Sequence, residues 1–179
     1  YAKQVLIPYK LSQNGPHITV CNLNGDHRED FFIGGAAGYS GNIFLHSTSG
    51  QFEKSKQAAL ETDKNAEDQE SAIIDTDGDG DLDLIVTSGS NEFTDKDPAL
   101  KVRLYLNDGK GTFTRAGTKQ FPDLLVNGQC IEAFDADGDK DLDLFIGGRL
   151  VGGQYCISAG SKLLINQSGT FTDQTKSLA

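Results

Sequence analysis

The sequence predicts an all-β fold, a β-propeller of four-stranded antiparallel blades with three blades present. Three observations predict it: an acidic segment occurs three times, each copy leads into an apolar strand and a polar glycine turn, and no segment keeps a helical period. Four short strands that recur every 50–60 residues or so are typical of a propeller blade.

The three copies align without gaps over sixteen residues and read VCNLNGDHREDFFIGG, IIDTDGDGDLDLIVTS and AFDADGDKDLDLFIGG. This alignment places Asn22, Asp75 and Asp135 in register, with spacings of 53 and 60 residues (75 − 22 and 135 − 75). Downstream, the segments IFLHSTSGQF, LYLNDGKGTF and LLINQSGTF each end in a phenylalanine, which is Phe52, Phe113 or Phe171.

Each copy predicts a strand, an acidic turn, a second strand, a variable loop, a third strand, a tight turn and a fourth strand. The expected strands are residues 17–22, 30–35, 42–47 and 51–56, then 70–75, 83–89, 102–107 and 112–117, then 130–135, 143–149, 162–167 and 170–175.

These strands define the expected organisation of the chain. It comprises 1–16 as a strand of a neighbouring blade or a linker, 17–60 as blade 1, 61–69 as an acidic linker, 70–117 as blade 2, 118–128 as a linker, 129–176 as blade 3 and 177–179 as a tail. Residues 56–70 contain enough alanine and glutamate for a helical turn, but we interpret them as a solvated connection.

The N-terminal segment alternates Val5, Ile7, Tyr9 and Leu11, which is the pattern of one more strand, from a neighbouring blade. A propeller has about four to eight blades, so three cannot close a ring. We expect a fragment of a longer propeller, with self-association of copies or a partner chain as the alternatives.

The charge of the chain indicates the kind of ligand it attracts. With 16 basic and 26 acidic residues the formal charge is −10, which argues against nucleic acid and anionic membrane surfaces and in favour of cations. No run approaches the roughly 20 apolar residues of a membrane helix, so no membrane insertion is expected.

The acid is concentrated in two nine-residue windows of five aspartates each. Two carboxylates about 5 Å apart repel by about 3 kcal/mol at an effective dielectric constant of about 20, and a divalent cation removes that cost. Hard oxygens at alternate positions suit Ca²⁺, whereas zinc prefers cysteine and histidine. The expected ligands are the side chains of Asp75, Asp77, Asp79 and Asp83 with the Asp81 carbonyl, and the side chains of Asp135, Asp137, Asp139 and Asp143 with the Asp141 carbonyl.

The first copy is expected to bind calcium more weakly, because two amides replace carboxylates. Its ligands would be Asn22, Asn24, Asp26 and Asp30 with the carbonyl of Arg28. Two strong sites and one weaker site are thus predicted, and three ions would move the formal charge from −10 to about −4. The alternatives are solvated acidic turns without an ion and an EF-hand, which needs a glutamate where this chain has Val86 and Ile146.

The motif D-x-D-G-D-G-D-x-D-L followed by a strand and Gly-Gly resembles the FG-GAP repeat of integrin α-subunit propellers and the VCBS repeat of bacterial surface proteins. The Ile-Gly-Gly after Phe32 and Phe145 matches the glycine pattern of the repeat, and LYLNDGKGTF is typical of the VCBS form. The combination is similar to bacterial surface proteins that carry an ASPIC/UnbV domain. The resemblance extends over 17–175, and the asparagine-rich first turn and the Thr87-Ser88 pair in place of Gly-Gly depart from it. It implies a calcium-bearing propeller for adhesion or for binding protein or glycan, usually without catalysis.

Strand parity places the acidic turns on one face of the blades and the second, variable loops on the other. Loops that vary in length usually carry recognition. The candidate contact residues in these loops are Asn91, Glu92, Phe93, Arg149 and Tyr155. The alternative is that the loops only cover blade edges.

The three cysteines leave one thiol unpaired in any arrangement. Cys21 aligns with apolar residues and is expected to be buried, whereas Cys130 and Cys156 fall on one face, where a disulfide is an open alternative. Because weak calcium sites need millimolar calcium, an extracellular, cell-surface or periplasmic location is expected.

The predicted function is therefore a calcium-stabilised, non-catalytic binding or adhesion module for protein or glycan. The alternative is a carbohydrate-active propeller, either a lectin or a component of a polysaccharide lyase. His17, His27 and His46 lack the context of a catalytic triad.

Overall fold

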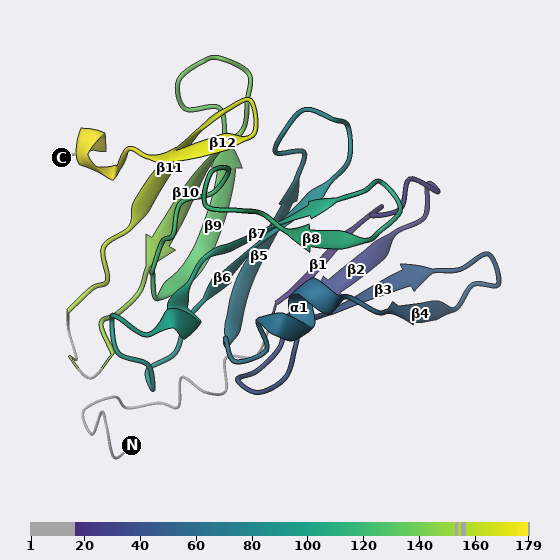
Figure 1. Ribbon diagram of the computed structural model, residues 1–179, viewed down its shortest axis with the longest axis horizontal. Helices are drawn as coiled ribbons and strands as arrows, with labels where there is room; N and C mark the ends of the chain where they lie inside the picture. The colour runs from purple at the N-terminus through teal and green to yellow at the C-terminus, as the bar shows by residue number, and fades with distance from the viewer. Residues whose placement is uncertain (1–16, 153, 155–156, 179) are drawn as a thin grey trace.

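A computed structural model describes residues 17–152, 154 and 157–178, and these residues form three four-stranded antiparallel sheets (Figure 1). In each sheet the strands are hydrogen-bonded in chain order. This is the architecture of successive propeller blades, so the predicted fold class is confirmed. The strand expected at Val5–Leu11 lies outside the described residues.

The strand bounds follow the repeat closely. Blade 1 contains β1 (Ile18–Cys21), β2 (Asp30–Ile33), β3 (Asn42–His46) and β4 (Phe52–Ser55); blade 2 contains β5 (Asp68–Ile74), β6 (Asp83–Ser88), β7 (Arg103–Asn107) and β8 (Phe113–Arg115); blade 3 contains β9 (Gly128–Phe134), β10 (Asp143–Gly148), β11 (Lys162–Gln167) and β12 (Thr170–Asp173).

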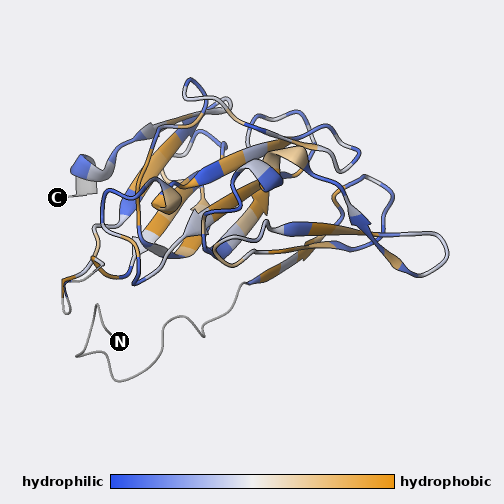
Figure 2. Ribbon diagram, turned by 60° about the horizontal axis from the view of Figure 1, so that its bottom comes forward, coloured by the Kyte–Doolittle hydropathy of each residue, from blue (hydrophilic) through white to orange (hydrophobic). Residues whose placement is uncertain are grey.

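The first strands of the three blades lie next to one another, with β5 in contact with both β1 and β9 (Figure 1). The hydrophobic core lies between the blades, where the central strands carry most of the apolar residues (Figure 2). One cluster joins blades 1 and 2, around Phe32, Leu84 and Tyr105, and a second joins blades 2 and 3, around Ile85, Leu144 and Ile146. Because each blade is covered by its neighbour, the junctions between blades fix the array.

The interpretation of residues 56–70 as a solvated connection was wrong. Helix α1 (Ala58–Thr62) forms there and buries Leu60, which is 3% exposed, in the core between blades 1 and 2. The Gln57 amide fixes the start of this helix to blade 2, since it donates to the Gly111 carbonyl (2.7 Å) and accepts from the Phe113 N–H (3.0 Å). One buried leucine among good helix formers is enough to turn the segment into packed structure.

The connection between blades 2 and 3, residues 118–128, is also packed. Phe121, Leu124 and Val126 are buried in the core between these blades, and the Phe121 ring meets the Phe171 ring edge to face at 5.4 Å between centroids. A 3-10 helix (Pro98–Leu100) in the long β6–β7 loop leads into β7, and residues 118–128 cover the start of that strand. A second 3-10 helix (Thr175–Leu178) follows β12.

A buried ion pair within blade 2 is also hydrogen-bonded to blade 1. The Arg103 guanidinium lies 2.5 Å from Asp68 Oδ1 and also donates to Ser88 Oγ at 2.7 Å. The other oxygen of Asp68 accepts from the Gly35 N–H in the β2–β3 loop of blade 1, at 2.8 Å. Asp68 belongs to β5, so this strand begins inside the segment expected to be an acidic linker.

Candidate metal-binding turns and a pocket on the opposite face

Two of the acidic turns gather three carboxylates each within the described part of the chain. The groups are Asp75, Asp77 and Asp83 between β5 and β6, and Asp135, Asp137 and Asp143 between β9 and β10; within each group the oxygens lie within 4.8 Å of one another. Positive φ angles bend each loop back on itself, at Gly78 and Gly80 in one turn and at Gly138 and Lys140 in the other.

The last aspartate of each turn is buried and ties the turn to the third strand of its blade. Asp83, 1% exposed, accepts from the Thr76 N–H (3.1 Å) and, through its other oxygen, from the Asn107 N–H (2.8 Å). Asp143 does the same for Ala136 and Asn166, both at 2.7 Å. Asp83 and Asp143 thus fix the shape of their turns, and each is also one of the three clustered aspartates of its turn.

The electrostatics of the two turns favour a cation. The pKa of Asp77 is raised by desolvation and by the nearby charges of Asp79 and Asp75. Desolvation raises the pKa of Asp137 as well, with the charges of Asp139 and Asp143 acting in the same direction. Because each carboxylate disfavours the ionisation of its neighbours, an oxygen-loving divalent ion fits this donor set.

The remaining predicted ligands lie in the same turns but outside the two groups. Asp79 and Asp139 each accept from the N–H two residues on, at 2.9 Å. The Asp141 side chain accepts from the Ser168 N–H in the β11–β12 turn, at 2.7 Å. Metal binding by these residues stays a prediction.

The first turn has a different counter-charge. The Arg28 guanidinium lies 2.6 Å from Asp26 Oδ2 and donates through Nε to the His46 carbonyl at 2.9 Å. The pKa of Asp26 is lowered, first by the hydrogen bond from the Arg28 N–H and further by Asn24 and the Arg28 charge. Asn22 and Asn24 turn their side-chain oxygens to the Asp26 N–H, and Asp30, fully buried, accepts from the Leu23 and His46 N–H groups.

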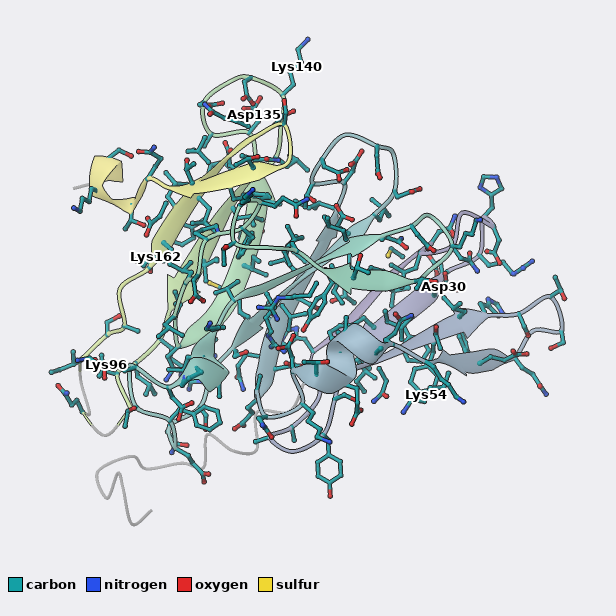
Figure 3. All side chains as sticks on the ribbon, in the orientation of Figure 1. Asp30, Lys54, Lys96, Asp135, Lys140 and Lys162 are labelled. Carbon is teal, nitrogen blue, oxygen red and sulfur yellow. The ribbon has the colours of Figure 1, made fainter. Side chains whose placement is uncertain are left out.

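A polar pocket lies on the opposite face, between blades 2 and 3. Figure 3 places Asp135 at one end of the blades and Lys96, in the β6–β7 loop, at the other. The pocket is shallow, with only about 20 Å³ of enclosed space, and is lined by Glu67, Gln69, Gly89, Ser90, Asn91, Asn127, Gly128, Arg149 and Leu150. A Cβ on Gly89 would lie 2.7 Å from Asn127 Oδ1, so the glycine allows the two chain segments to meet there.

The structure brings together two of the five predicted contact residues, Asn91 and Arg149, in this pocket. The backbone of Phe93 instead meets the β10–β11 loop, because a Cβ on Gly152 would lie 1.8 Å from the Phe93 carbonyl oxygen. Glu92 lies in the same loop and its N–H donates to Ser90 Oγ at 3.1 Å, whereas Tyr155 falls outside the described residues.

Sequence reasoning missed three lining residues of the pocket: Glu67 and Asn127, from the links between blades, and Gln69, at the start of β5. The Asn127 amide donates to the Ser90 carbonyl at 2.7 Å and holds the second loop of blade 2 against the link. Strand parity was the available signal, because each link enters its blade on the face where the second loops lie.

The cysteines give no disulfide within the described residues. Cys130 is an exposed thiol, and the expected partner, Cys156, lies outside the described part of the chain. Cys21 is half-buried, and burial, assisted by the Asp30 charge, raises its pKa to about 11.

Three blades follow one another along the chain, and each has an aspartate- or asparagine-rich turn between its first and second strands. This arrangement defines a segment of a β-propeller. Comparison with protein families identifies it further, because a family of FG-GAP-like repeats matches residues 22–86 and 75–146. The chain belongs to the FG-GAP-like repeat family.

Among the solved structures, eight chains match. One is a lectin from Agrocybe aegerita described by its specific recognition of non-reducing terminal N-acetylglucosamine. It is 22% identical with a TM-score of 0.55, and the match covers 89% of this chain and 37% of the lectin. This chain therefore spans well under half the length of that relative, and the likeness establishes the fold. No curated protein sequence matches the chain.

No helix within the described ranges has the length and apolar character needed to cross a membrane.

Proposed function

We propose that this chain is a calcium-stabilised binding module that recognises a glycan in the pocket between blades 2 and 3. The observation that carries the proposal is that the two candidate sites lie on opposite faces of the blades. The carboxylate groups lie on one face and an open polar pocket lies on the other. The proposal assigns no catalytic step to the chain, and it places the protein outside the cytoplasm, where calcium is abundant.

The chemistry of the pocket suits a sugar. Glu67 accepts hydrogen bonds, Arg149 donates them, and the amides of Gln69 and Asn91 do both, which matches the mixed donor and acceptor character of sugar hydroxyls. The lectin-type structural relative supports a glycan rather than a peptide.

Calcium would act at a distance from this pocket. In the second and third turns, the three-aspartate groups would hold it, and the bound ion would offset the mutual repulsion of carboxylates that connect the first and second strands. Its role is to stiffen the turns, so the pocket on the other face depends on it only through the stability of the blades.

Glycan-array screening tests the recognition. We expect the calcium-loaded chain to bind a restricted set of glycans, and Arg149→Ala to weaken binding about tenfold or more, as loss of a charged hydrogen bond in a pocket would. Tyr39→Ala, on an exposed loop of blade 1, is the matched control and should bind normally. Binding that survives Arg149→Ala and Asn91→Ala together would contradict the pocket assignment.

Thermal unfolding with calcium and with EGTA tests the metal separately. At a hundredfold excess over Kd each site should add about 2.7 kcal/mol to the free energy of unfolding. Asp77→Asn together with Asp137→Asn should remove this gain and leave the EGTA-treated protein little changed. An unfolding curve that is the same with and without EGTA would rule out the calcium role.

A further inference from the structure

In two places, the turn between the third and fourth strands of one blade lies against the acidic turn of the blade before it. Asn107, in blade 2, donates through Nδ2 to the Leu23 carbonyl in the acidic turn of blade 1, at 2.8 Å. Asn166, in blade 3, donates through Nδ2 to the Thr76 carbonyl in the acidic turn of blade 2, at 2.9 Å. Asn107 aligns with Asn166, and Leu23 aligns with Thr76. The same hydrogen bond between neighbouring blades therefore occurs twice.

Both asparagines are buried, and a bond within their own turn fixes their direction. Asn166 is 1% exposed, and its Oδ1 accepts from the Gly169 N–H at 3.0 Å. Asn107 is 7% exposed, and its Oδ1 accepts from the Gly111 N–H at 3.2 Å. Because the oxygen of each amide is bonded inside one blade and its nitrogen donates to another, the amide fixes the two turns relative to each other.

A glycine in each turn allows the close approach. A Cβ on Gly169, in the β11–β12 turn, would lie 2.7 Å from Asp77 Cβ. A Cβ on Gly111, in the β7–β8 turn, would lie 3.7 Å from Asn24 Cβ. Asn24 and Asp77 occupy equivalent positions in their acidic turns, so this contact also repeats. The fit is tighter at blade 3, where a methyl group on Gly169 would overlap Asp77.

The bond from Asn166 reaches the carboxylates of the second turn through a single residue. Thr76 accepts from Asn166 through its carbonyl and donates through its N–H to Asp83 Oδ2, at 3.1 Å. The Thr76 hydroxyl donates to the same oxygen. Asp83 is one of the three clustered aspartates, and Asp77, which lies against Gly169, is another. Blade 3 therefore contacts the turn of blade 2 next to two of its three clustered carboxylates.

The third acidic turn is less covered in the described part of the chain, although it also has five aspartates. Ala136 holds the position of Leu23 and Thr76 in this turn. Leu23 is 1% and Thr76 is 2% exposed, whereas Ala136 is exposed. Asp135 is exposed as well, while the equivalent Asp75 is half-buried. The third turn is therefore an internal comparison for the second turn, on which blade 3 lies.

We propose that Asn166 is a positioning residue for the second acidic turn: from blade 3, it holds the clustered aspartates of blade 2 close together. The effect on metal affinity rests on the calcium role proposed for this turn. Without an ion the clustered carboxylates repel one another and favour an open turn. A turn that is closed for only a fraction of the time has its affinity reduced by that fraction. The bond from Asn166 opposes opening, so it raises the calcium affinity.

The same coupling makes the contact between blades 2 and 3 depend on calcium. Binding free energies are reciprocal, so an ion that binds better when Asn166 is bonded to Thr76 also stabilises that bond by the same factor. Calcium in the second turn should thus strengthen the contact between two blades.

Hydrogen exchange in EGTA, followed by mass spectrometry, tests the positioning without the metal. In the second turn the Gly78 and Gly80 N–H groups donate to Asp75, at 2.8 and 3.1 Å. Opening of the turn breaks these bonds and so speeds their exchange. We expect Asn166→Ala to speed exchange in this turn about three- to tenfold, the effect of losing one hydrogen bond of ordinary strength. The third turn should exchange as before, because the substitution keeps the Asn166 N–H that donates to Asp143.

Calorimetric titration with calcium tests the consequence for affinity. Asp137→Asn removes a ligand of the third turn and leaves the second to be measured, and Asp77→Asn does the reverse. Asn166→Ala should weaken the second turn about three- to tenfold and leave the third unchanged. Gly169→Ala, which places a methyl group against Asp77, should also weaken the second turn. Val126→Ala removes buried atoms from the core between blades 2 and 3 and is the control, since it should lower stability without changing either affinity.

The proposal is overturned if Asn166→Ala leaves both exchange and affinity of the second turn unchanged. Equal weakening of the second and third turns, or an equal effect of Val126→Ala, would also overturn it, since either result would show a general loss of stability. A chain that binds no calcium would refute the calcium role in the proposed function. The exchange rates in EGTA decide the role of Asn166 in either case, so the two failures are distinguishable.

Discussion

Arg28 is a single side chain that changes the charge of a whole turn. The second and third turns each contain five aspartates, whereas the first contains Asp26 and Asp30 with a guanidinium 2.6 Å from Asp26. The position that was expected to offer only its carbonyl thus also supplies a positive charge. A calcium ion would have to compete with that charge for Asp26.

Replacing Arg28 with glutamine should therefore strengthen the weakest calcium-binding step. A unit charge about 6 Å from a divalent ion costs about 1.4 kcal/mol in water, so about a tenfold gain in affinity is expected. Isothermal titration calorimetry measures it. Lys140→Gln is the control, since Lys140 belongs to the third turn and extends away from it (Figure 3). An identical titration for Arg28→Gln and the unchanged protein would contradict the competition.

The side chain of Glu67 makes the stability of the folded protein depend on pH. Burial raises its pKa, the Glu92 charge adds to the rise, and a hydrogen bond from Ser90 opposes it. The folded protein therefore disfavours the charged form, so Glu67 lowers stability once the pH passes the ordinary glutamate pKa of about 4.3, and fully so above its raised value.

We expect Glu67→Gln to be more stable than the unchanged protein at neutral pH. The difference should shrink as the pH falls and disappear below about pH 4, where the unchanged side chain is protonated in both states. Urea unfolding at a series of pH values measures it. A stability difference that increases on acidification would have the wrong sign for this explanation.

At the scale of the element, the acidic turn performs two tasks with different residues. Asp83 is buried and accepts hydrogen bonds from the Thr76 and Asn107 N–H groups, so it anchors the turn to β7. Asp75 and Asp77 are less buried and form the rest of the carboxylate group. The same division holds between Asp143 and its neighbours in blade 3.

Asp83→Ala and Asp77→Asn should accordingly fail in different ways. Asp83→Ala leaves two buried N–H donors without a partner and should lower the free energy of unfolding by about 2–6 kcal/mol, with or without calcium. Asp77→Asn should leave the stability in EGTA nearly unchanged and reduce only the gain from calcium. Equilibrium unfolding in both conditions separates the two, and equal losses in EGTA would refute the division.

At the scale of the whole molecule, the blades are held together by packed cores with polar ties at defined points. Asp68 is one of these, because it binds Arg103 within blade 2 and the Gly35 N–H of blade 1. Both partners of the ion pair are buried, with side chains 4% and 7% exposed. A charge left alone at this depth is costly.

Asp68→Ala should therefore destabilise the protein by about 3–5 kcal/mol, because it leaves the Arg103 guanidinium buried without its carboxylate. The double variant Asp68→Leu with Arg103→Met removes both charges and should recover most of the loss. Chemical denaturation of the single and double variants measures the difference. A double variant that is less stable than Asp68→Ala would contradict this assignment of the cost to the unpaired charge.

The sequence by itself determined the blades, because an alternating strand pattern and a repeated acidic turn are local features that recur with a fixed spacing. All twelve described strands overlap the expected ones, and the carboxylate groups lie in the two turns where five aspartates occur together. Only the tertiary structure decided how the connections pack. Leu60 and Phe121 carry no periodic pattern, and their burial depends on which blade surfaces they meet. The same holds for the pocket, where Glu67 and Arg149 meet only because two blades stand side by side.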